Sequence, residues 1–574
     1  MSSGPPTAPT TAHSTAHSAV AGTVTADHAV AHTLLNCLLR EISGPEHRTA
    51  VSHGHLLLRL PRCGALLRVR LRRTSLIGAH RFTGPVTAEH DGAWRELPWR
   101  DLAEHIHREL ELRTGVRNDE FLAQVAASHA GVTAALAATA GPGPAADPYV
   151  ASEQSLLLGH RFHPTPKART GTPADWRRYA PEARTRFPLR HLAVRREHIR
   201  QESTAPGALA ALDRQGEVPE GYVLLPAHPW QYAMLRDHPA LRAALARRDV
   251  IDLGPRGTAF APTASVRTLY DGRDFLKFSL NVRITNCLRK NAEYELTGAV
   301  ALTRLLEPVA AGLAARFPGV ELLREPGYRT LGLGGRDLAE GFGVIVREGL
   351  GARLGRGLTG LLAAAVADEY PTGDAQLARL LGGRGESEAL AWWHTYLALL
   401  VPPVLAAYFD HGVVLEPHLQ NVVVGVDDEG FPRQVLLRDL EGAKLLPDHH
   451  AAALAALDPA VARSVTYDRE RGWDRVVYCL LVNHLAEMLA ALADRHPHLE
   501  PALWSAVRDV LAARAAAHGD PPPLRALVAG VPLPAKANLL TRWQRLPDRD
   551  AGYVRIGSPL ATDVLSALSA GAAR

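Results

Sequence analysis

Lysine and cysteine are scarce in this chain, and each scarcity limits the kinds of site that the sequence can form. Only five of the 64 lysine and arginine residues are lysine, namely Lys167, Lys277, Lys290, Lys444 and Lys536. Because arginine serves almost everywhere else, a retained lysine is a candidate for a position that arginine cannot fill. The scattered cysteines are Cys37, Cys63, Cys287 and Cys479. The absence of a CxxC pair argues against a zinc knuckle or a disulfide framework and suits a reducing cytoplasm.

The sequence also shows no long hydrophobic run and no basic block, and we expect no signal peptide. Its most apolar stretch, residues 397–409, is too short to span a bilayer and contains Pro402 and Pro403. The N-terminus has no charged start followed by an apolar core. The net charge of +5 is small, and no basic run is interleaved with aromatics. We therefore expect a cytoplasmic enzyme without nucleic-acid or membrane partners, with a local cationic pocket for an acidic substrate.

The hydrophobic pattern divides the 574 residues into several regions. Residues 1–26 contain the repeat TAHSTAHS and no periodic apolar residues, so we expect a disordered tail with solvated histidines. The stretch AGPGPAADP (140–148) is typical of a linker. The other expected elements are a helix near 29–42, strands to about 97, helices over 101–140, an α/β region over 150–380, an apolar helix over 388–410, a strand and hairpin over 413–446, and helices over 473–495 and 501–518.

The stretch SVRTLYDGRDFLKFSLNVRITNCLRKN (265–291) concentrates anion-binding groups on a strand pattern. Ser265, Arg267 and Thr268 offer two hydroxyls and a guanidinium within four residues, and DGRD (271–274) predicts a turn. Lys277 lies on the run after this turn, and Arg289 follows. Arginine binds oxyanions with two prongs and lysine as a point charge, so the hairpin suits a polyphosphate or carboxylate. An exposed hairpin with solvated charges is the alternative.

Two further stretches are candidate binding segments. In GHRFHPTPKARTG (159–171) the prolines exclude a helix interior, so His163 and Lys167 should be displayed, where they could clamp an acid with several carboxylates. The alternative is a basic surface loop. HPWQ (228–231) follows an apolar strand, a position where ligands are often bound. His228 and Trp230 could equally close the core.

A third set of residues has the pattern of a magnesium site. EPHLQN (416–421) precedes a β-branched run, DDEG (427–430) predicts a hairpin turn, and the returning strand ends at RD (438–439). This hairpin should bring His418, Asn421 and Asp439 to one sheet edge. Protein kinases hold Mg²⁺ against nucleotide phosphates with Asn and Asp in this arrangement. Glu416 occupies the position of the kinase base, which leaves a phosphotransferase open, although no glycine-rich lid is visible.

Taken together, these motifs resemble the NRPS-independent siderophore synthetases, the aerobactin-synthetase (IucA/IucC) family. In chain order they are EQ (153–154), GHRFHPTPKARTG, HPWQ, SVRT with KFSLNVRITNCLR, EPHLQN, RDLEG (438–442) and KANLLTR (536–542). The resemblance spans about residues 30–545. It implies an α/β (α+β) fold shaped as a cupped hand. The implied parts are a tail (1–26), a thumb (27–148), a fingers domain with the ATP-phosphate hairpin (149–385), and a palm with the kinase-like hairpin and an FhuF-like region (386–574).

The resemblance also implies a reaction that uses ATP and Mg²⁺. A carboxylate attacks the α-phosphate of Mg·ATP to give an acyl-adenylate and pyrophosphate, and an amine or hydroxyl then displaces AMP. The acid would be citrate, a citryl derivative, 2-oxoglutarate or a succinyl-hydroxamate chain, and the enzyme is compatible with a homodimer. A small-molecule phosphotransferase, which releases ADP, and a non-catalytic binder of acidic ligands remain alternatives.

Matched motif to motif, the resemblance implies roles for individual residues. The residues expected at ATP are Ser265, Arg267, Thr268, Lys277, Arg289 and Asn421. Those expected at the acid are His163, Lys167, Arg289 and His418. Mg²⁺ would be held by Asp439 with Asn421 or Glu416. The expected catalytic residues are Lys277, His418 and Arg289, the last stabilising the pentavalent phosphate. The link Arg161-Phe162 and Pro417 depart from the family pattern near the acid, so they leave the identity of the acid open.

Overall fold

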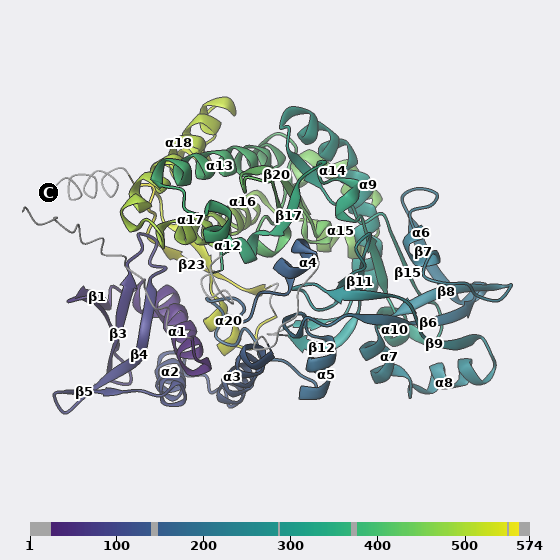
Figure 1. The fold of residues 1–574 in the computed structure, drawn as a ribbon, viewed down its shortest axis with the longest axis horizontal. Coiled ribbons are helices and arrows are strands. Elements are labelled where there is room, and N and C mark those ends of the chain that lie inside the picture. Colours follow the sequence, from purple (N-terminus) through teal and green to yellow (C-terminus); the bar gives the residue numbers. More distant parts are fainter. Residues whose placement is uncertain (1–23, 139–146, 285–286, 369–375, 548–549, 562–574) are drawn as a thin grey trace, which may run out of the picture.

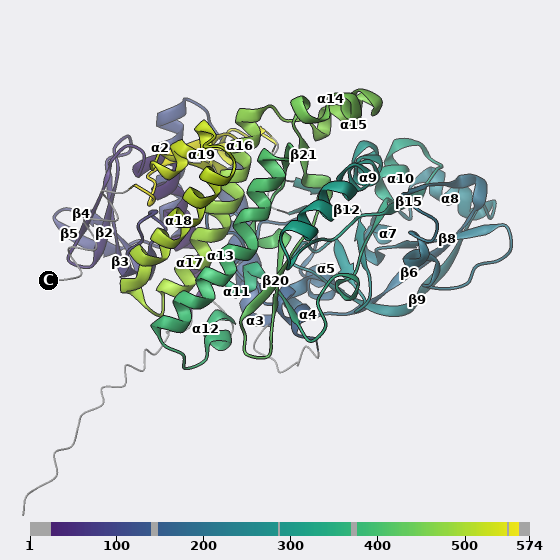
Figure 2. The same cartoon turned by 90° about the horizontal axis from the view of Figure 1, so that it is seen from above.

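The computed structural model describes residues 24–138, 147–284, 287–368, 376–547 and 550–561. Most of the expected tail (1–26) and linker (140–148) lies outside these residues. The chain forms a thumb at one end of the long axis, fingers at the other end and a palm between them (Figure 1). The same order is visible from above in Figure 2. Each part combines helices and strands, which confirms the expected α/β (α+β) class.

The thumb is an antiparallel five-stranded sheet with three helices. Its strands, in sheet order, are β1 (Thr49–Ser52), β2 (His55–Leu60), β3 (Ala65–Arg73), β4 (Arg81–His90) and β5 (Ala93–Glu96). Its helices are α1 (Ala26–Leu38), α2 (Trp99–Thr114) and α3 (Glu120–Ala138). These elements confirm the predicted order of helix, strands and helices. The core also contains Leu539 and Trp543 of helix α20 (Asn538–Trp543), from the far end of the chain.

The fingers are built on one antiparallel sheet of eight strands. Their order is β7 (Ile199–Ser203), β15 (Gly327–Leu331), β16 (Val344–Arg347), β11 (Phe275–Phe278), β10 (Thr268–Tyr270), β9 (Val250–Pro262), β6 (Phe187–Arg195) and β8 (Tyr222–Ala227). The predicted hairpin of residues 265–291 is confirmed and supplies the two central strands, β10 and β11. His228 and Trp230 are buried against Tyr179. Of the two interpretations of HPWQ, the structure therefore shows the core one.

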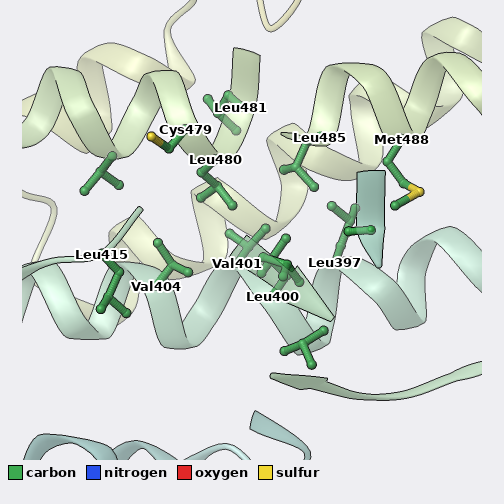
Figure 3. Packing of buried hydrophobic residues seen from close by; sticks show 14 of the residues in the cluster. Leu397, Leu400, Val401, Val404, Leu415, Cys479, Leu480, Leu481, Leu485 and Met488 are labelled. Atoms are coloured by element: carbon green, nitrogen blue, oxygen red, sulfur yellow. The ribbon is translucent and has the colours of Figure 1, made fainter. Parts of the chain in front are cut away.

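The palm has a helical layer and a four-stranded sheet. Helix α13 (Glu386–Phe409) continues through Pro402 and Pro403, although proline removes a helical hydrogen bond. Its neighbours Leu400 and Val401 are fully buried, so tertiary packing holds the helix together there. Figure 3 shows these side chains packed against Leu485 of the opposing helix.

The palm sheet draws strands from two of the predicted domains. The hairpin β19 (Val422–Val426) and β20 (Pro432–Leu437) is confirmed. Strand β14 (Val320–Leu322) pairs with β20, and β17 (Thr359–Leu362) pairs with β19. Both added strands precede residue 385, so the predicted boundary there runs through one sheet.

A long helix at residues 469–493 changes geometry in its middle. It consists of α16 (Arg469–Val477), the π-helical segment η7 (Tyr478–Leu485) and α17 (Ala486–Ala493). The sequence pattern predicts a helix here but not its π-helical part. By length and composition this helix, α3, α9 (Glu293–Arg316) and α13 could each cross a membrane. The most apolar window of residues 469–493 is 94% buried inside the protein, where it forms the palm core.

Candidate active site

The predicted phosphate turn, residues 263–267, joins β9 to β10 near the middle of the fingers sheet. Ser265 Oγ accepts a hydrogen bond from the Thr268 N–H at 3.2 Å, and the Arg267 N–H donates to the Ser265 carbonyl at 2.8 Å. The second bond closes a three-residue turn around Val266, whose φ is +67°. A β-branched residue at positive φ is strained, and such strain persists only where the surroundings enforce it.

Lys277 reaches the site from β11, where it pairs in register with Thr268. It is 2% exposed, and its ammonium group lies among three carboxylates. It donates a hydrogen bond to Asp439 and lies 2.9 Å from Glu441 Oε2 and 3.8 Å from Glu325 Oε1. Burial alone would lower the pKa of Lys277, but the three carboxylates outweigh burial and raise it. Lys277 is therefore a fixed cation.

Two arginines complete the cluster, which we call the charged group. It consists of Lys277, Arg267, Arg347, Glu325, Asp439 and Glu441. Arg347 Nη2, from the adjacent strand β16, lies 2.6 Å from Glu325 Oε1 and 2.7 Å from Asp439 Oδ1. Arg267 Nη2 lies 3.4 Å from Glu441 Oε1. Each carboxylate of the group thus has a guanidinium partner as well as Lys277.

Asp439 follows the palm strand β20 in a left-handed backbone conformation, with φ of +71°. This conformation is less costly for Asp than for most residues. Burial opposes ionisation of Asp439, yet Lys277 and Arg347 outweigh it and hold the pKa of its carboxyl far below the usual range. Asp439 is therefore held in its charged, carboxylate form.

The carboxylates of Glu325, Asp439 and Glu441 could also hold a metal ion. One oxygen from each lies within 4.8 Å of the others, and no other such group of three occurs in the described ranges. Mg²⁺ prefers oxygen ligands and is usually bound by one or two carboxylates together with substrate phosphates. This donor set fits Mg²⁺.

Asn421 and Glu416 lie beside this group without belonging to it. The hairpin β19–β20 brings Asn421 and Asp439 to one sheet edge, where the Arg438 N–H donates to the Asn421 carbonyl at 3.0 Å. The Asn421 amide donates to the Glu416 carbonyl at 3.3 Å, while Glu416 Oε1 lies 3.3 Å from Arg475 Nε. The roles of Asn421 and Glu416 at the metal stay predictions.

The predicted acid-binding loop is more closely packed than expected. His163 is buried, and its Nδ1 accepts a hydrogen bond from the Thr165 N–H at 3.1 Å. Lys167 donates to the Leu156 carbonyl at 3.0 Å and lies 3.7 Å from Glu182 Oε1. The prediction that both side chains are displayed is therefore wrong for His163. Lys167 is half-buried and already bound, because the loop folds back onto its neighbours.

His418 lies in the palm, and Arg289 lies in the fingers. His418 is half-buried, and burial lowers the pKa of its imidazole, although Glu416 and Asp439 oppose the shift. Arg289 ends β13 (Cys287–Arg289), a short strand paired with β12 (Leu280–Ile284), and is also half-buried. A neutral imidazole can exchange a proton with a substrate, and a guanidinium can bind an oxyanion. Their catalytic roles stay predictions.

Sequence reasoning missed three members of the charged group. Glu441 lies inside the motif RDLEG, but nothing in that motif distinguishes it from Glu416 as a metal ligand. Glu325 and Arg347 belong to no recognised motif. They reach the site because β16 pairs with β11 and because Glu325 lies in the short loop between β14 and β15.

Comparisons with known proteins identify the family of this chain. The IucA / IucC family model matches residues 148–368, and a model described as ferric iron reductase FhuF-like transporter matches residues 390–551. The rhizobactin siderophore biosynthesis protein RhbC of Rhizobium meliloti is 31% identical over 92% of this chain and 96% of its own length. The L-2,3-diaminopropanoate–citrate ligase of Staphylococcus aureus is 32% identical over 63% of this chain and 65% of its own length.

Solved structures show the same fold. The structure of ATP-bound aerobactin synthetase IucA from Klebsiella pneumoniae superposes with a TM-score of 0.82 at 25% identity, covering 94% of this chain and all of the other. The petrobactin biosynthesis protein AsbB of Bacillus anthracis superposes with a TM-score of 0.75 at 18% identity, which supports the fold alone. On these grounds the chain belongs to the IucA/IucC family of NRPS-independent siderophore synthetases.

Proposed function

We propose that this protein is an ATP-dependent siderophore synthetase that activates a carboxylate as an acyl-adenylate and condenses it with an amine or hydroxyl nucleophile. The acid oxygen attacks the α-phosphorus of ATP, and the bond to the bridging oxygen breaks, releasing pyrophosphate. The nucleophile then attacks the acyl carbon and displaces AMP, losing one proton. Relatives named for citrate, with partners such as diaminopropanoate and spermidine, support citrate or a citryl derivative as the acid.

The observation that carries this proposal is the balanced charged group around Lys277. Three cations and three carboxylates meet where the fingers sheet contacts the palm hairpin. Such a group can separate when Mg·ATP binds, since phosphates attract the cations and the metal attracts the carboxylates. The ATP-bound relative of the same fold supports nucleotide binding by this fold.

In this proposal each residue contributes position or charge. Ser265, Thr268, Arg267 and Lys277 bind the phosphates, and Arg289 lies between phosphate and acid, where it stabilises the charge of the pentavalent phosphorus. When bound by Asp439, Glu325 and Glu441, Mg²⁺ would neutralise part of the phosphate charge. The protein supplies little covalent chemistry, so the rate enhancement comes from orientation and fixed positive charge.

The acid is oriented by the loop of residues 159–171 and by His418. Lys167 is held by Glu182, so it acts as a fixed positive charge at the rim of the acid site. His418, whose lowered pKa keeps it neutral at pH 7, can hydrogen-bond a carboxylate or take the proton of the incoming nucleophile. These roles, like a cytoplasmic location, are part of the proposal.

A phosphotransferase is the second candidate, but one contact disfavours it. Its base would be Glu416, which lies beside the Arg475 guanidinium. This ion pair occupies the carboxylate that a kinase base would have to present to a substrate hydroxyl.

Product analysis tests the proposal. The protein is incubated with Mg·ATP, hydroxylamine as a generic nucleophile, and citrate, 2-oxoglutarate or a succinyl-hydroxamate chain in separate reactions. Acid-dependent AMP, pyrophosphate and hydroxamate are the expected products, and they would also identify the acid class. ADP with a phosphorylated product would contradict the proposal in favour of a phosphotransferase. Ligand binding without turnover would indicate a non-catalytic binder.

A further inference from the structure

A buried ion pair joins two residues to which the proposed reaction gives no direct role. Glu153, of the motif EQ, and Arg438, which precedes Asp439, have side chains that are 1% and 4% exposed. Arg438 Nη1 lies 2.5 Å from Glu153 Oε1 and 2.6 Å from the Tyr149 hydroxyl oxygen. A buried charge without its partner is strongly destabilising, so neither residue is accommodated without the other.

Each member of the pair holds a different loop of the site. Glu153 Oε2 accepts a hydrogen bond from the Ala264 N–H at 2.9 Å, at the start of the phosphate turn. Arg438 donates from Nε and Nη2 to the Gln420 carbonyl, at 3.0 Å and 2.7 Å. Gln420 lies in the loop of residues 416–421, and Arg438 itself is bonded to Asp439. One ion pair therefore contacts both the fingers side and the palm side of the site.

The phosphate turn needs such an external support. Val266 is held at a positive φ, which the turn's own hydrogen bonds do not favour for a β-branched residue. The neighbouring Gln154 adds a second anchor, because its amide donates to the Pro262 carbonyl at 3.3 Å. Helix α4 (Pro148–Glu153) and the residue after it thus fix the backbone on the N-terminal side of the turn.

We propose that Glu153 and Arg438 are positioning residues that fix the phosphate turn relative to the Asp439 loop. In this way they hold the ATP phosphates in line with the three carboxylates of Glu325, Asp439 and Glu441. This inference rests on the proposed function. The geometry requires arginine, because a guanidinium can bind Glu153 and the Gln420 carbonyl at once through different nitrogens. A lysine ammonium is a compact point charge and does not reproduce that fork.

The substitution Arg438→Lys tests the inference, since it keeps the buried positive charge beside Glu153. We expect the KM for ATP to rise by about 10- to 100-fold, the scale of a small misplacement of reacting groups, with a thermal midpoint close to wild type. The matched control is Arg329→Lys. Arg329 is also a buried arginine that binds a carboxylate, Asp213 at 2.8 Å, and a carbonyl, Leu224 at 2.6 Å, but away from the charged group. It should leave the KM for ATP unchanged.

A second variant covers the case in which Arg438→Lys does not fold. The double substitution Glu153→Gln with Arg438→Met removes both charges, which buried pairs often tolerate. It should fold and show the same rise in KM. A wild-type KM in either folded variant, an equal rise in the Arg329→Lys control, or loss of folding in both variants would overturn the inference.

Failure of the inference can be told apart from failure of the proposed function. Mg·ATP binding is measured directly by calorimetric titration, in parallel with AMP formation. A wild-type protein that binds Mg·ATP but forms no AMP would contradict the proposed reaction, while the variants' affinities would still test the positioning role. Equal Mg·ATP affinity in wild type and Arg438→Lys would overturn the positioning role whatever the reaction is.

Discussion

The ammonium group of Lys277 donates a hydrogen bond to the carboxylate of Asp439, a residue 162 positions later in the chain. Lys277 belongs to the fingers hairpin and Asp439 to the palm hairpin, so this contact closes one part of the protein on the other at the site. Both groups are ionised at neutral pH, because each holds the other's pKa in the charged range.

Lys277→Ala should lower the rate of acid-dependent pyrophosphate release by at least ~10²-fold, the scale expected when one preorganised charge is removed. Lys290→Ala is the matched control, because Lys290 is bound to Glu340 at 2.9 Å outside the charged group. A near-wild-type rate for Lys277→Ala would mean that the phosphates bind elsewhere.

Arg289→Ala should cut adenylation by a similar factor, at least ~10²-fold, because a guanidinium between phosphate and acid acts on the transition state. Single-turnover measurement of acyl-adenylate formation isolates this step from the later condensation. Full activity of Arg289→Ala would mean that the phosphate site has been misplaced. Undiminished acid affinity in an Arg289→Ala protein that forms no product would mean that the acid site has been misplaced.

Two sets of residues are candidate Mg²⁺ ligands: Asp439 with Glu325 and Glu441, and Asp439 with Asn421 or Glu416. Titrating activity with Mg²⁺ distinguishes them. Asp439→Asn and Glu441→Gln should each raise the Mg²⁺ concentration for half-maximal activity by about 10-fold or more, since ligand changes commonly cost that much affinity. Glu416→Gln should have a smaller effect, because Glu416 is bound to Arg475. A larger effect of Glu416→Gln than of Glu441→Gln would favour Asp439 with Asn421 or Glu416 as the ligands. Chelation by EDTA should abolish activity in every variant.

Glu41 of the thumb should make stability fall as pH rises. Burial raises the pKa of its carboxyl to about 8, despite hydrogen bonds from the backbone N–H groups of Leu539 and Leu540. The unfolded value is near 4.5, so between about pH 4.5 and 8 the folded state binds more protons than the unfolded state. The free energy of unfolding should therefore decrease over this window, by at most about 1.4 kcal/mol per pH unit.

Urea denaturation of wild type and Glu41→Gln at several pH values between 5 and 8 measures this slope. The substitution shifts stability by a constant amount and should remove the contribution of Glu41 to the slope. Parallel curves for the two proteins would show that Glu41 is charged throughout and that its two backbone donors outweigh burial.

Local sequence signals predicted the hairpins of the site well. DGRD and DDEG have the composition of tight turns, and the strand-like runs beside them correctly predicted β10–β11 and β19–β20. Asn421 and Asp439 were expected at one sheet edge for the same reason, and the structure places them there. These predictions needed only neighbours within about 25 residues.

Contacts between distant segments could not be predicted in this way. Glu325 and Arg347 enter the charged group through strand pairings that no local pattern specifies. His163 was expected to be displayed, because prolines exclude a helix, but prolines do not prevent a loop from packing. The π-helical segment η7 was missed, since one extra residue per turn leaves the apolar periodicity of a short helix almost unchanged.

Leu539 and Trp543 complete the core of the thumb, although about 400 residues separate them from its last helix. During synthesis the thumb leaves the ribosome before the fingers and the palm, yet its core lacks these two side chains until helix α20 has been made. At ribosomal speeds of roughly 5–20 residues per second, that interval lasts on the order of 20–80 s. The nascent thumb thus spends this time with an unfilled apolar site, a natural target for chaperones, and its final packing is coupled to the synthesis of residues 538–543.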